Sequence, residues 1–250
     1  MERSGKYFAN RTALVTGGVR RLGLVIAERI AREGARVVIT YFGSGRTEVR
    51  RAVRVLEEAG ASEARAIRCD IADLTQVSKL VTTLTRKGQT VDFLVNSAAN
   101  FLKEEFFEAT PESFDASIAL NVRGPFFLSQ AAAPGMKRNG FGRIVNIADV
   151  AGVIPWPAYL AHSISKAGLI AMTRGLAKAL APEVLVNAVA PGPVMLPDGF
   201  NSTETRHAIE PTILKRPGSP EEVAEAVVFL LRSDYITGIT LPVDGGRLIR

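Results

Sequence analysis

The stretch "TALVTGGVRRLGLVIAERIA", residues 12–31, places a glycine-rich turn between a short apolar run and an amphipathic segment. The run at 12–17 is typical of a buried strand, and the apolar spacing at 21–33 is typical of a helix. Gly17, Gly18 and Gly23 allow the backbone to approach a pyrophosphate held at the N-terminus of that helix. The stretch therefore predicts a nucleotide-binding strand–turn–helix unit.

The rest of the chain repeats this alternation of apolar runs and amphipathic segments. Strands are expected at 35–40, 64–70, 91–98, 142–149, 184–192 and 239–246, and helices at 46–60, 73–87, about 110–130, 158–181 and 219–232. The strand runs lack polar alternation, which indicates burial on both faces of a parallel sheet. Repeated strand–helix units predict a Rossmann-like, doubly wound α/β fold with three layers, α/β/α.

Domain organisation follows from length and from the absence of linkers. The 250 residues include no Pro-, Gly- or Ser-rich linker and no internal repeat, so we expect one domain over residues 1–250. The irregular segment 191–218 is the one long interruption. Because long loops in compact domains tend to be functional, we expect a substrate lid at about 194–217.

Composition narrows the class of protein and its partners. The single cysteine, Cys69, excludes an internal disulfide and a Cys-based zinc site, and it fits a reducing, cytoplasmic location. We expect no metal, and the polar N-terminus predicts neither a signal peptide nor a membrane span. The net charge of +6 reflects either a solvated basic surface or steering of an anionic ligand. No basic run carries interleaved aromatics, so we expect no nucleic acid partner.

The end of the second expected strand bears on the choice of cofactor. NAD sites usually place an acidic residue there, and "TYFGSGR" at 40–46 contains none. Arg20, Arg21 and Arg46, with Ser44 as a hydroxyl donor, can instead surround a 2′-phosphate. The alternative is that these arginines are solvated helix residues. We expect NADPH/NADP rather than NAD.

Seven short motifs occur in a family-specific order. They are "TGGVRRLG" (16–23), "CDIAD" (69–73), "NSAAN" (96–100), "LNVRGPFF" (120–127), "SISKAG" (163–168), "VAPGPV" (189–194) and "VDGG" (243–246). Over essentially its whole length the chain resembles the short-chain dehydrogenase/reductase family. The resemblance implies a homo-oligomer, a tetramer or a dimer, and an NADP site. The cofactor positions expected from the turn and the resemblance are Gly17, Arg20, Arg21, Leu22, Gly23, Tyr41, Ser44, Arg46, Asp70, Ile71, Asn96, Ser97, Ala98, Lys166, Pro191, Gly192 and Val194.

Within that family the chain looks most like the pteridine reductases. Arg21 in the glycine turn and Asp149 are typical of them, and Phe101 matches the aromatic residue that stacks on the pterin ring. Ala99 and Asn100 depart from their pattern. The resemblance implies hydride transfer to a pteridine-like small molecule such as a dihydropterin or dihydrofolate. The substrate-binding positions it implies are Phe101, Asp149, Trp156, Tyr159 and His162.

The catalytic constellation departs from the family's Asn, Ser, Tyr and Lys. Asn121 and Lys166 match the first and last, whereas His162 stands at the tyrosine position and Asp149 stands at the serine position, thirteen residues earlier. Lys166 follows His162 by four residues, so both lie on one helical face. A nearby cation disfavours an imidazolium ion, whereas an ionised carboxylate favours it. We hypothesise that Asp149 and His162 titrate as a pair and that His162 supplies the proton.

Several alternatives remain open at this stage. Tyr159, nearly one helical turn before His162, can replace it as the acid. Asp149 can be an ordinary turn cap, and Trp156 can line the pocket or only pack the helix entry. His207 is expected to face solvent. The chain is then an NADPH-dependent reductase of a pteridine-like or carbonyl substrate, a 3-oxoacyl or simple ketone reductase, or a catalytically silent NADP-binding scaffold.

Overall fold

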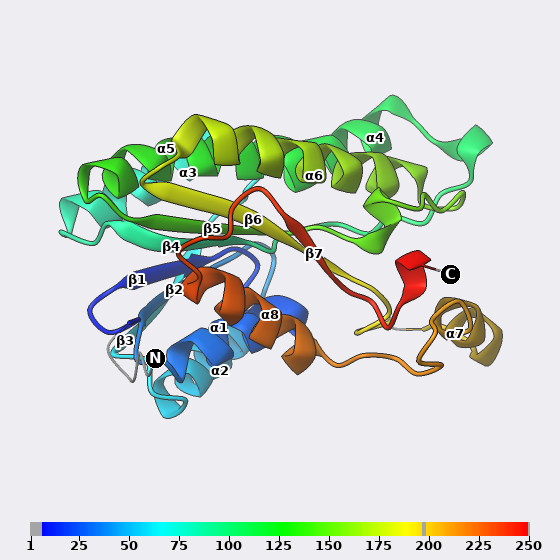
Figure 1. Cartoon of the computed structure of the whole chain (residues 1–250), viewed down its shortest axis with the longest axis horizontal. Helices are drawn as coiled ribbons and strands as arrows, with labels where there is room; N and C mark the ends of the chain where they lie inside the picture. The colour runs from blue at the N-terminus through cyan, green and yellow to red at the C-terminus, as the bar shows by residue number, and fades with distance from the viewer. Residues whose placement is uncertain (1–6, 197–198, 250) are drawn as a thin grey trace.

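The computed structural model describes residues 7–196 and 199–249, and its centre is a seven-stranded sheet with helices on both faces (Figure 1). The strands are β1 (Thr12–Val15), β2 (Arg36–Tyr41), β3 (Glu63–Arg68), β4 (Val91–Asn96), β5 (Gly142–Ile147), β6 (Val184–Pro191) and β7 (Thr240–Val243). The α-helices are α1 (Arg21–Ala31), α2 (Arg46–Glu58), α3 (Leu74–Arg86), α4 (Pro111–Ile118), α5 (Gly124–Arg138), α6 (Leu160–Leu180), α7 (Ser202–Ile209) and α8 (Pro220–Arg232). Short helical turns are η1 (Phe106–Glu108), η2 (Ala119–Arg123), η3 (Val150–Gly152) and η4 (Arg247–Ile249).

The strand order explains where a ligand can bind. The order is β3-β2-β1-β4-β5-β6-β7, and every neighbouring pair is parallel. The chain therefore begins at the central strand β1, adds β2 and β3 on one side, and then adds β4 to β7 on the other side. Connections leave β1 and β4 toward opposite sides, which opens a crevice at their carboxyl ends. The predicted Rossmann-like, doubly wound α/β fold is confirmed.

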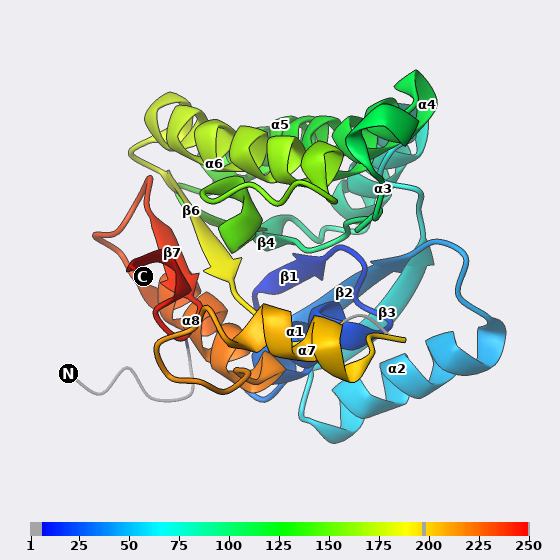
Figure 2. The ribbon, with the colours of Figure 1, turned by 90° about the vertical axis from the view of Figure 1, so that its right-hand side faces the viewer.

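The helices form two layers around the sheet. The helices α1, α2 and α8 cover one face, and α3 to α6 cover the other (Figures 1 and 2). On the first face Ile26 and Ile30 of α1 pack with Val227 of α8. On the second face Leu14 of β1 and Leu128 of α5 share a buried cluster. Burial of each such side chain stabilises the fold by about 1.5–3 kcal/mol, so apolar packing holds a helix layer against each face of the sheet.

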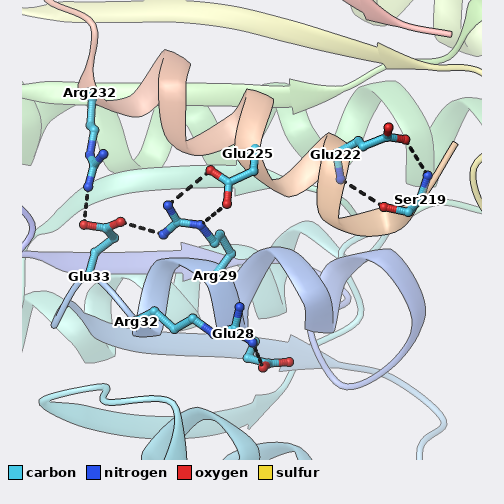
Figure 3. A network of polar contacts seen from close by, with 8 residues as sticks. All are labelled: Glu28, Arg29, Arg32, Glu33, Ser219, Glu222, Glu225 and Arg232. Carbon is cyan, nitrogen blue, oxygen red and sulfur yellow. Dashed lines mark hydrogen bonds and ion pairs between the residues drawn. The ribbon is translucent and has the colours of Figure 1, made fainter. Parts of the chain in front are cut away.

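Ion pairs hold α8 beside α1 (Figure 3). Arg29 of α1 contacts Glu33 and Glu225, each at 2.5 Å, and Arg232 of α8 contacts the same Glu33. The hydrogen bond to Glu225 raises the pKa of Arg29. Exposed ion pairs of this kind contribute little energy singly, but a shared carboxylate fixes the relative position of the two helices. The network thus steadies α1, whose first turn forms part of the crevice.

Three expectations about the elements need correction. The helix expected at about 110–130 is divided into α4, the π-helical turn η2 and α5. The segment 191–218 is not wholly irregular, because it contains α7 with a capping box between Asn201 and Glu204. The strands expected at 142–149 and 184–192 end earlier, at Ile147 and Pro191.

Within the described residues, no helix combines the length and the apolar character that a membrane crossing requires.

Candidate active site

The glycine turn joins the carboxyl ends of β1 and β4. Gly17 has a φ of +65°, and a Cβ atom there would lie 3.0 Å from Cα of Ala98. A Cβ atom on Gly23 would lie 2.3 Å from the carbonyl oxygen of Gly17. The Thr16 hydroxyl accepts hydrogen bonds from the backbone N–H groups of Ser97 and Ala98, both at 2.9 Å. At both glycine positions only a hydrogen atom fits. The turn can therefore leave open space beside the start of α1.

A cleft of about 460 Å³ lies over this turn. The expected cofactor residues that line it are Gly17, Arg20, Arg21, Leu22, Gly23, Tyr41, Ser44, Asp70, Ile71, Ser97, Ala98, Lys166, Pro191, Gly192 and Val194. The lining at the end of β2 contains no carboxylate and consists of Thr40, Tyr41, Phe42 and Ser44. Arg20 and Arg21 also line the cleft. A cleft with this donor set, beside a helix N-terminus, fits a phosphorylated dinucleotide.

Two of the expected cofactor residues do not line the cleft. Asn96 is buried, and its amide donates to Oδ1 of Asn146 at 2.8 Å. Because side chains alternate along a strand, this one turns away from the crevice into the packing between β4 and β5. Arg46 is an exposed residue at the first position of α2 and lies outside the lining. For these two residues, contact with the cofactor stays a prediction from the sequence.

Asn121 occupies the π-helical turn η2 and connects three segments. Its Oδ1 accepts the backbone N–H of Asn100 at 3.0 Å. Its Nδ2 donates to Oγ of Ser165 at 2.9 Å and to Oδ1 of Asn100 at 3.0 Å. Single π-turns occur often at functional sites. Here the turn carries the asparagine to the loop after β4 and to α6, and so fixes the position of Asn100.

His162 lies on α6, and its side chain is buried. Its Nδ1 lies 3.0 Å from the backbone carbonyl oxygen of Asn100. A carbonyl only accepts, so Nδ1 carries a hydrogen, and Nε2 is the nitrogen left for chemistry. Nε2 lies 3.5 Å from Oδ2 of Asp149 and has no hydrogen-bond partner among the described residues. The pair expected from the sequence is therefore in contact.

Asp149 has two partners rather than one. Its Oδ1 accepts the backbone N–H of Ala151 at 2.7 Å and caps η3, while its Oδ2 faces His162. Asp149 therefore caps η3 and contacts the imidazole ring at the same time. The cap also holds the carboxylate in place, because the oxygen that faces the imidazole cannot move far without breaking this partly buried hydrogen bond.

Lys166 lies one turn after His162 and is fully enclosed. Its Nζ donates to the carbonyl oxygen of Ile147 at 2.7 Å. Burial lowers the pKa of Lys166 to about 8, against an opposing contribution from Asp149. An ammonium group with a depressed pKa carries its charge near neutrality but loses it on the alkaline side.

The depressed pKa of Lys166 predicts a pH dependence of stability. The unfolded chain takes up the lysine proton below about pH 10.5, whereas the folded chain takes it up only below about pH 8. Between these values the unfolded state binds more protons, so stability from this group rises with pH, by about 1.4 kcal/mol per unit. We expect Lys166→Met to lose stability relative to the wild type over that window in urea unfolding. A difference that does not change with pH would show that Lys166 keeps an ordinary pKa.

A second pocket, of about 830 Å³, adjoins the cleft and shares Asp149 with it. Phe101 lines both, and its ring stacks on Tyr159 with centroids 4.2 Å apart and lies edge-on to His162 at 4.7 Å. Trp156 forms another wall of this pocket, and its ring centroid lies 6.2 Å from that of Phe101. Tyr159 lines this pocket and not the cofactor cleft, and burial raises its pKa. The expected substrate residues thus gather beside the Asp149–His162 pair.

The segment after β6 closes part of this pocket. Arg21 donates to the carbonyl oxygens of Met195 and Leu196, at 3.2 and 3.1 Å. Lys103 pairs with Glu204 of α7 at 3.0 Å. His207 is exposed, as expected, yet it also lines the pocket.

Two residues of the site were missed in the sequence. Asn100 contributes a backbone carbonyl, which no side-chain pattern reveals, and Arg247 lies near the far end of the chain. Arg247 also lines the second pocket. The only sequence signal for Arg247 is its position directly after the "VDGG" motif.

Comparison with known proteins places the chain in a family. A family model described as enoyl-(acyl carrier protein) reductase matches residues 18–247. A solved structure described as a short chain dehydrogenase/reductase family protein is 36% identical, with a TM-score of 0.85 and coverage of 97% of this chain and 99% of that one. The chain belongs to the short-chain dehydrogenase/reductase family. It is therefore an oxidoreductase of that family.

Two further similar proteins in this family carry more specific descriptions. The 3-oxoacyl-[acyl-carrier-protein] reductase MabA of Mycobacterium tuberculosis is 34% identical over 251 residues, which cover 96% of this chain and 93% of MabA. A blue fluorescent protein from a metagenomic library, crystallised with NADPH, is 35% identical with a TM-score of 0.88. That comparison covers 96% of this chain and 98% of the other.

Proposed function

We propose that this short-chain dehydrogenase/reductase reduces the carbonyl group of a small molecule, of the 3-oxoacyl or simple ketone class, with His162 as the proton donor. The observation that carries the proposal is the orientation of the imidazole. Nδ1 is committed to the carbonyl oxygen of Asn100, so Nε2 faces Asp149 at the junction of the two pockets.

The cofactor is NADPH/NADP. The cleft residues Arg20, Arg21 and Ser44, with no carboxylate at the end of β2, suit a 2′-phosphate, and a relative of similar structure was crystallised with NADPH. The glycine turn would hold the pyrophosphate, and Lys166 would lie against the ribose beside the nicotinamide. When bound, NADPH supplies the hydride that the carbonyl carbon receives.

The protein's own contribution is a proton at the carbonyl oxygen. With Nδ1 already a donor, Nε2 can donate only from a doubly protonated ring, and Oδ2 of Asp149 lies 3.5 Å from this nitrogen. The substrate oxygen takes the Nε2 proton as the carbon takes the hydride, which leaves an alcohol and a neutral ring. Asn121 acts by positioning Asn100, and therefore the ring, rather than by touching substrate.

The comparisons favour the oxoacyl or ketone class over the pteridine class. The family model and MabA both concern acyl carrier protein substrates. Phe101, which the resemblance assigns to pterin stacking, already has one face covered by Tyr159. Pteridine reduction therefore stays a prediction from the sequence and becomes one arm of the test.

A substrate panel tests the proposed function. We expect acetoacetyl-coenzyme A or a simple aromatic ketone to cause NADPH consumption, with dihydrobiopterin and dihydrofolate inactive and NADPH preferred to NADH. Turnover of only the two pteridines would replace the proposal by the pteridine assignment. Tight NADPH binding, measured by fluorescence titration, without turnover of any compound would instead identify a silent scaffold.

Three further assignments stay predictions. We infer that about 194–217 acts as a lid, which is supported by the contacts of Arg21 and Lys103 with this segment. A homotetramer or dimer is supported by exposed apolar residues on α4 and α5, Phe114, Phe126 and Phe127. A cytoplasmic location rests on the single, reduced Cys69.

A further inference from the structure

Arg247 forms part of the wall of the second pocket because a rigid turn directs it there. The carboxylate of Asp244 accepts two backbone N–H groups, those of Gly246 at 2.9 Å and Leu248 at 2.8 Å. These bonds bracket Arg247 at the first position of η4. The backbone position of Arg247 is therefore held before any ligand binds.

The guanidinium group of Arg247 has few partners for its five N–H donors. Its Cζ lies 5.1 Å from the centroid of the Trp156 ring, and Nη1 donates to the carbonyl oxygen of Ala208. Within residues 7–196 and 199–249 it makes no other hydrogen bond and no ion pair. Burial lowers the pKa of Arg247, which means that the charge is partly removed from water. A partly desolvated cation with spare donors favours an anionic partner.

The carboxylates near Arg247 are engaged elsewhere. Asp244 holds the turn, and Asp149 binds the backbone of Ala151 and faces His162. Glu204, the other carboxylate in the pocket wall, pairs with Lys103. Asp149 and Asp244 attract the guanidinium group of Arg247 through space, but among the described residues none of these three carboxylates forms an ion pair with it.

We infer that Arg247 binds a carboxylate group of the substrate, so that the protein selects carbonyl compounds with an acidic group. Arg247 would hold the acid, while the aromatic walls Phe101 and Trp156 enclose a flat or apolar body. The carbonyl group would then lie against His162. A pocket of about 830 Å³ is large enough for a ligand with all three parts. The inference rests on the proposed carbonyl reduction for the orientation of the ligand.

Two probes of equal size test this inference. 4-Acetylbenzoate carries a ketone, a flat ring and a carboxylate, and 4-acetylbenzamide replaces the carboxylate by an uncharged amide. Each is titrated calorimetrically into protein saturated with NADP⁺, and each is assayed as a substrate with NADPH. The wild type is compared with Arg247→Gln and with Arg54→Gln, which removes the same charge from an exposed position on α2.

We expect the wild type and Arg54→Gln to bind the benzoate at least about tenfold more tightly than the benzamide. Arg247→Gln should abolish that preference and raise KM for the benzoate, with a much smaller effect on benzamide binding. A variant that weakens both probes equally would show that Arg247 only supports the pocket through Ala208, and would overturn the inference. So would equal binding of the two probes by the wild type.

The design separates this inference from the proposed function. Reduction of both ketones at equal efficiency, with no effect of Arg247→Gln, would retain carbonyl reduction and remove the role of Arg247. A preference for the benzoate that is lost in Arg247→Gln, without turnover of either ketone, would retain the anion site and remove the proposed reaction.

Discussion

Replacing His162 by glutamine is expected to lower kcat for ketone reduction by about 10²- to 10⁴-fold, the usual contribution of a positioned acid. Glutamine preserves the approximate length of the side chain and places an amide group near the position of Nε2, but it has no ionisable proton to give. NADPH affinity should change much less than kcat, because Nε2 faces Asp149 and His162 is only one of many residues that line the cofactor cleft. Steady-state kinetics and a fluorescence titration with NADPH measure the two quantities separately.

Two companion variants identify the acid. Tyr159→Phe removes only a hydroxyl and keeps the ring that stacks on Phe101. If the loss of kcat follows Tyr159→Phe while His162→Gln retains full activity, the tyrosine is the donor. His162→Tyr restores the residue typical of the family. An increase in activity would show that the natural protein is a weakened enzyme, and a loss would show that the histidine works in its own setting of Asp149 and Asn100.

Replacing Gly23 by alanine is expected to weaken NADPH binding by about tenfold to one-hundredfold. The added Cβ would lie 2.3 Å from O and 2.9 Å from C of Gly17, and both of these are backbone atoms of the turn. Overpacking of this kind costs about 1–3 kcal/mol, and each 1.4 kcal/mol of binding energy is a factor of ten. The expected result is a raised Kd for NADPH in calorimetry together with a lowered Tm.

Gly175→Ala is the matched control, because this glycine also lies inside a helix but its added Cβ would meet nothing within 4 Å. Helix propensity alone then stabilises the variant by about 0.5–1 kcal/mol. NADPH binding should be unaffected. If Gly23→Ala binds NADPH as tightly as Gly175→Ala does, the turn does not approach the cofactor as we propose.

Much of the fold was predictable because burial and sequence pattern agree. The continuous apolar runs of β1, β4 and β5 contain residues buried in the structure, and their pattern alone indicated a parallel sheet. The helix α7 was missed for the converse reason. Its sequence "STETRHAI" has no apolar stripe and no buried residue, so only the capping signal of Asn201 and Glu204 marked it.

The candidate site was predictable where side chains carry the chemistry, and less so where the backbone does. The spacing of Asp149 and His162 indicated a pair, and the two are in contact. The carbonyl group of Asn100 has no signature, because every residue has one. The contact of the Asn96 amide with Asn146 was not predictable, because motif spacing says nothing about the direction in which a strand residue turns its side chain.

The hydroxyl of Thr16, which accepts the N–H groups of Ser97 and Ala98, has a thermodynamic consequence. It joins the segments that follow β1 and β4 at the bottom of the crevice, beyond the point where the two strands pair in the sheet. Because these segments are already ordered, ligand binding costs little free energy for ordering them. Adjustment to different ligands must therefore come from the segment after β6. Substrate selectivity can change there while the residues that bind the cofactor stay the same.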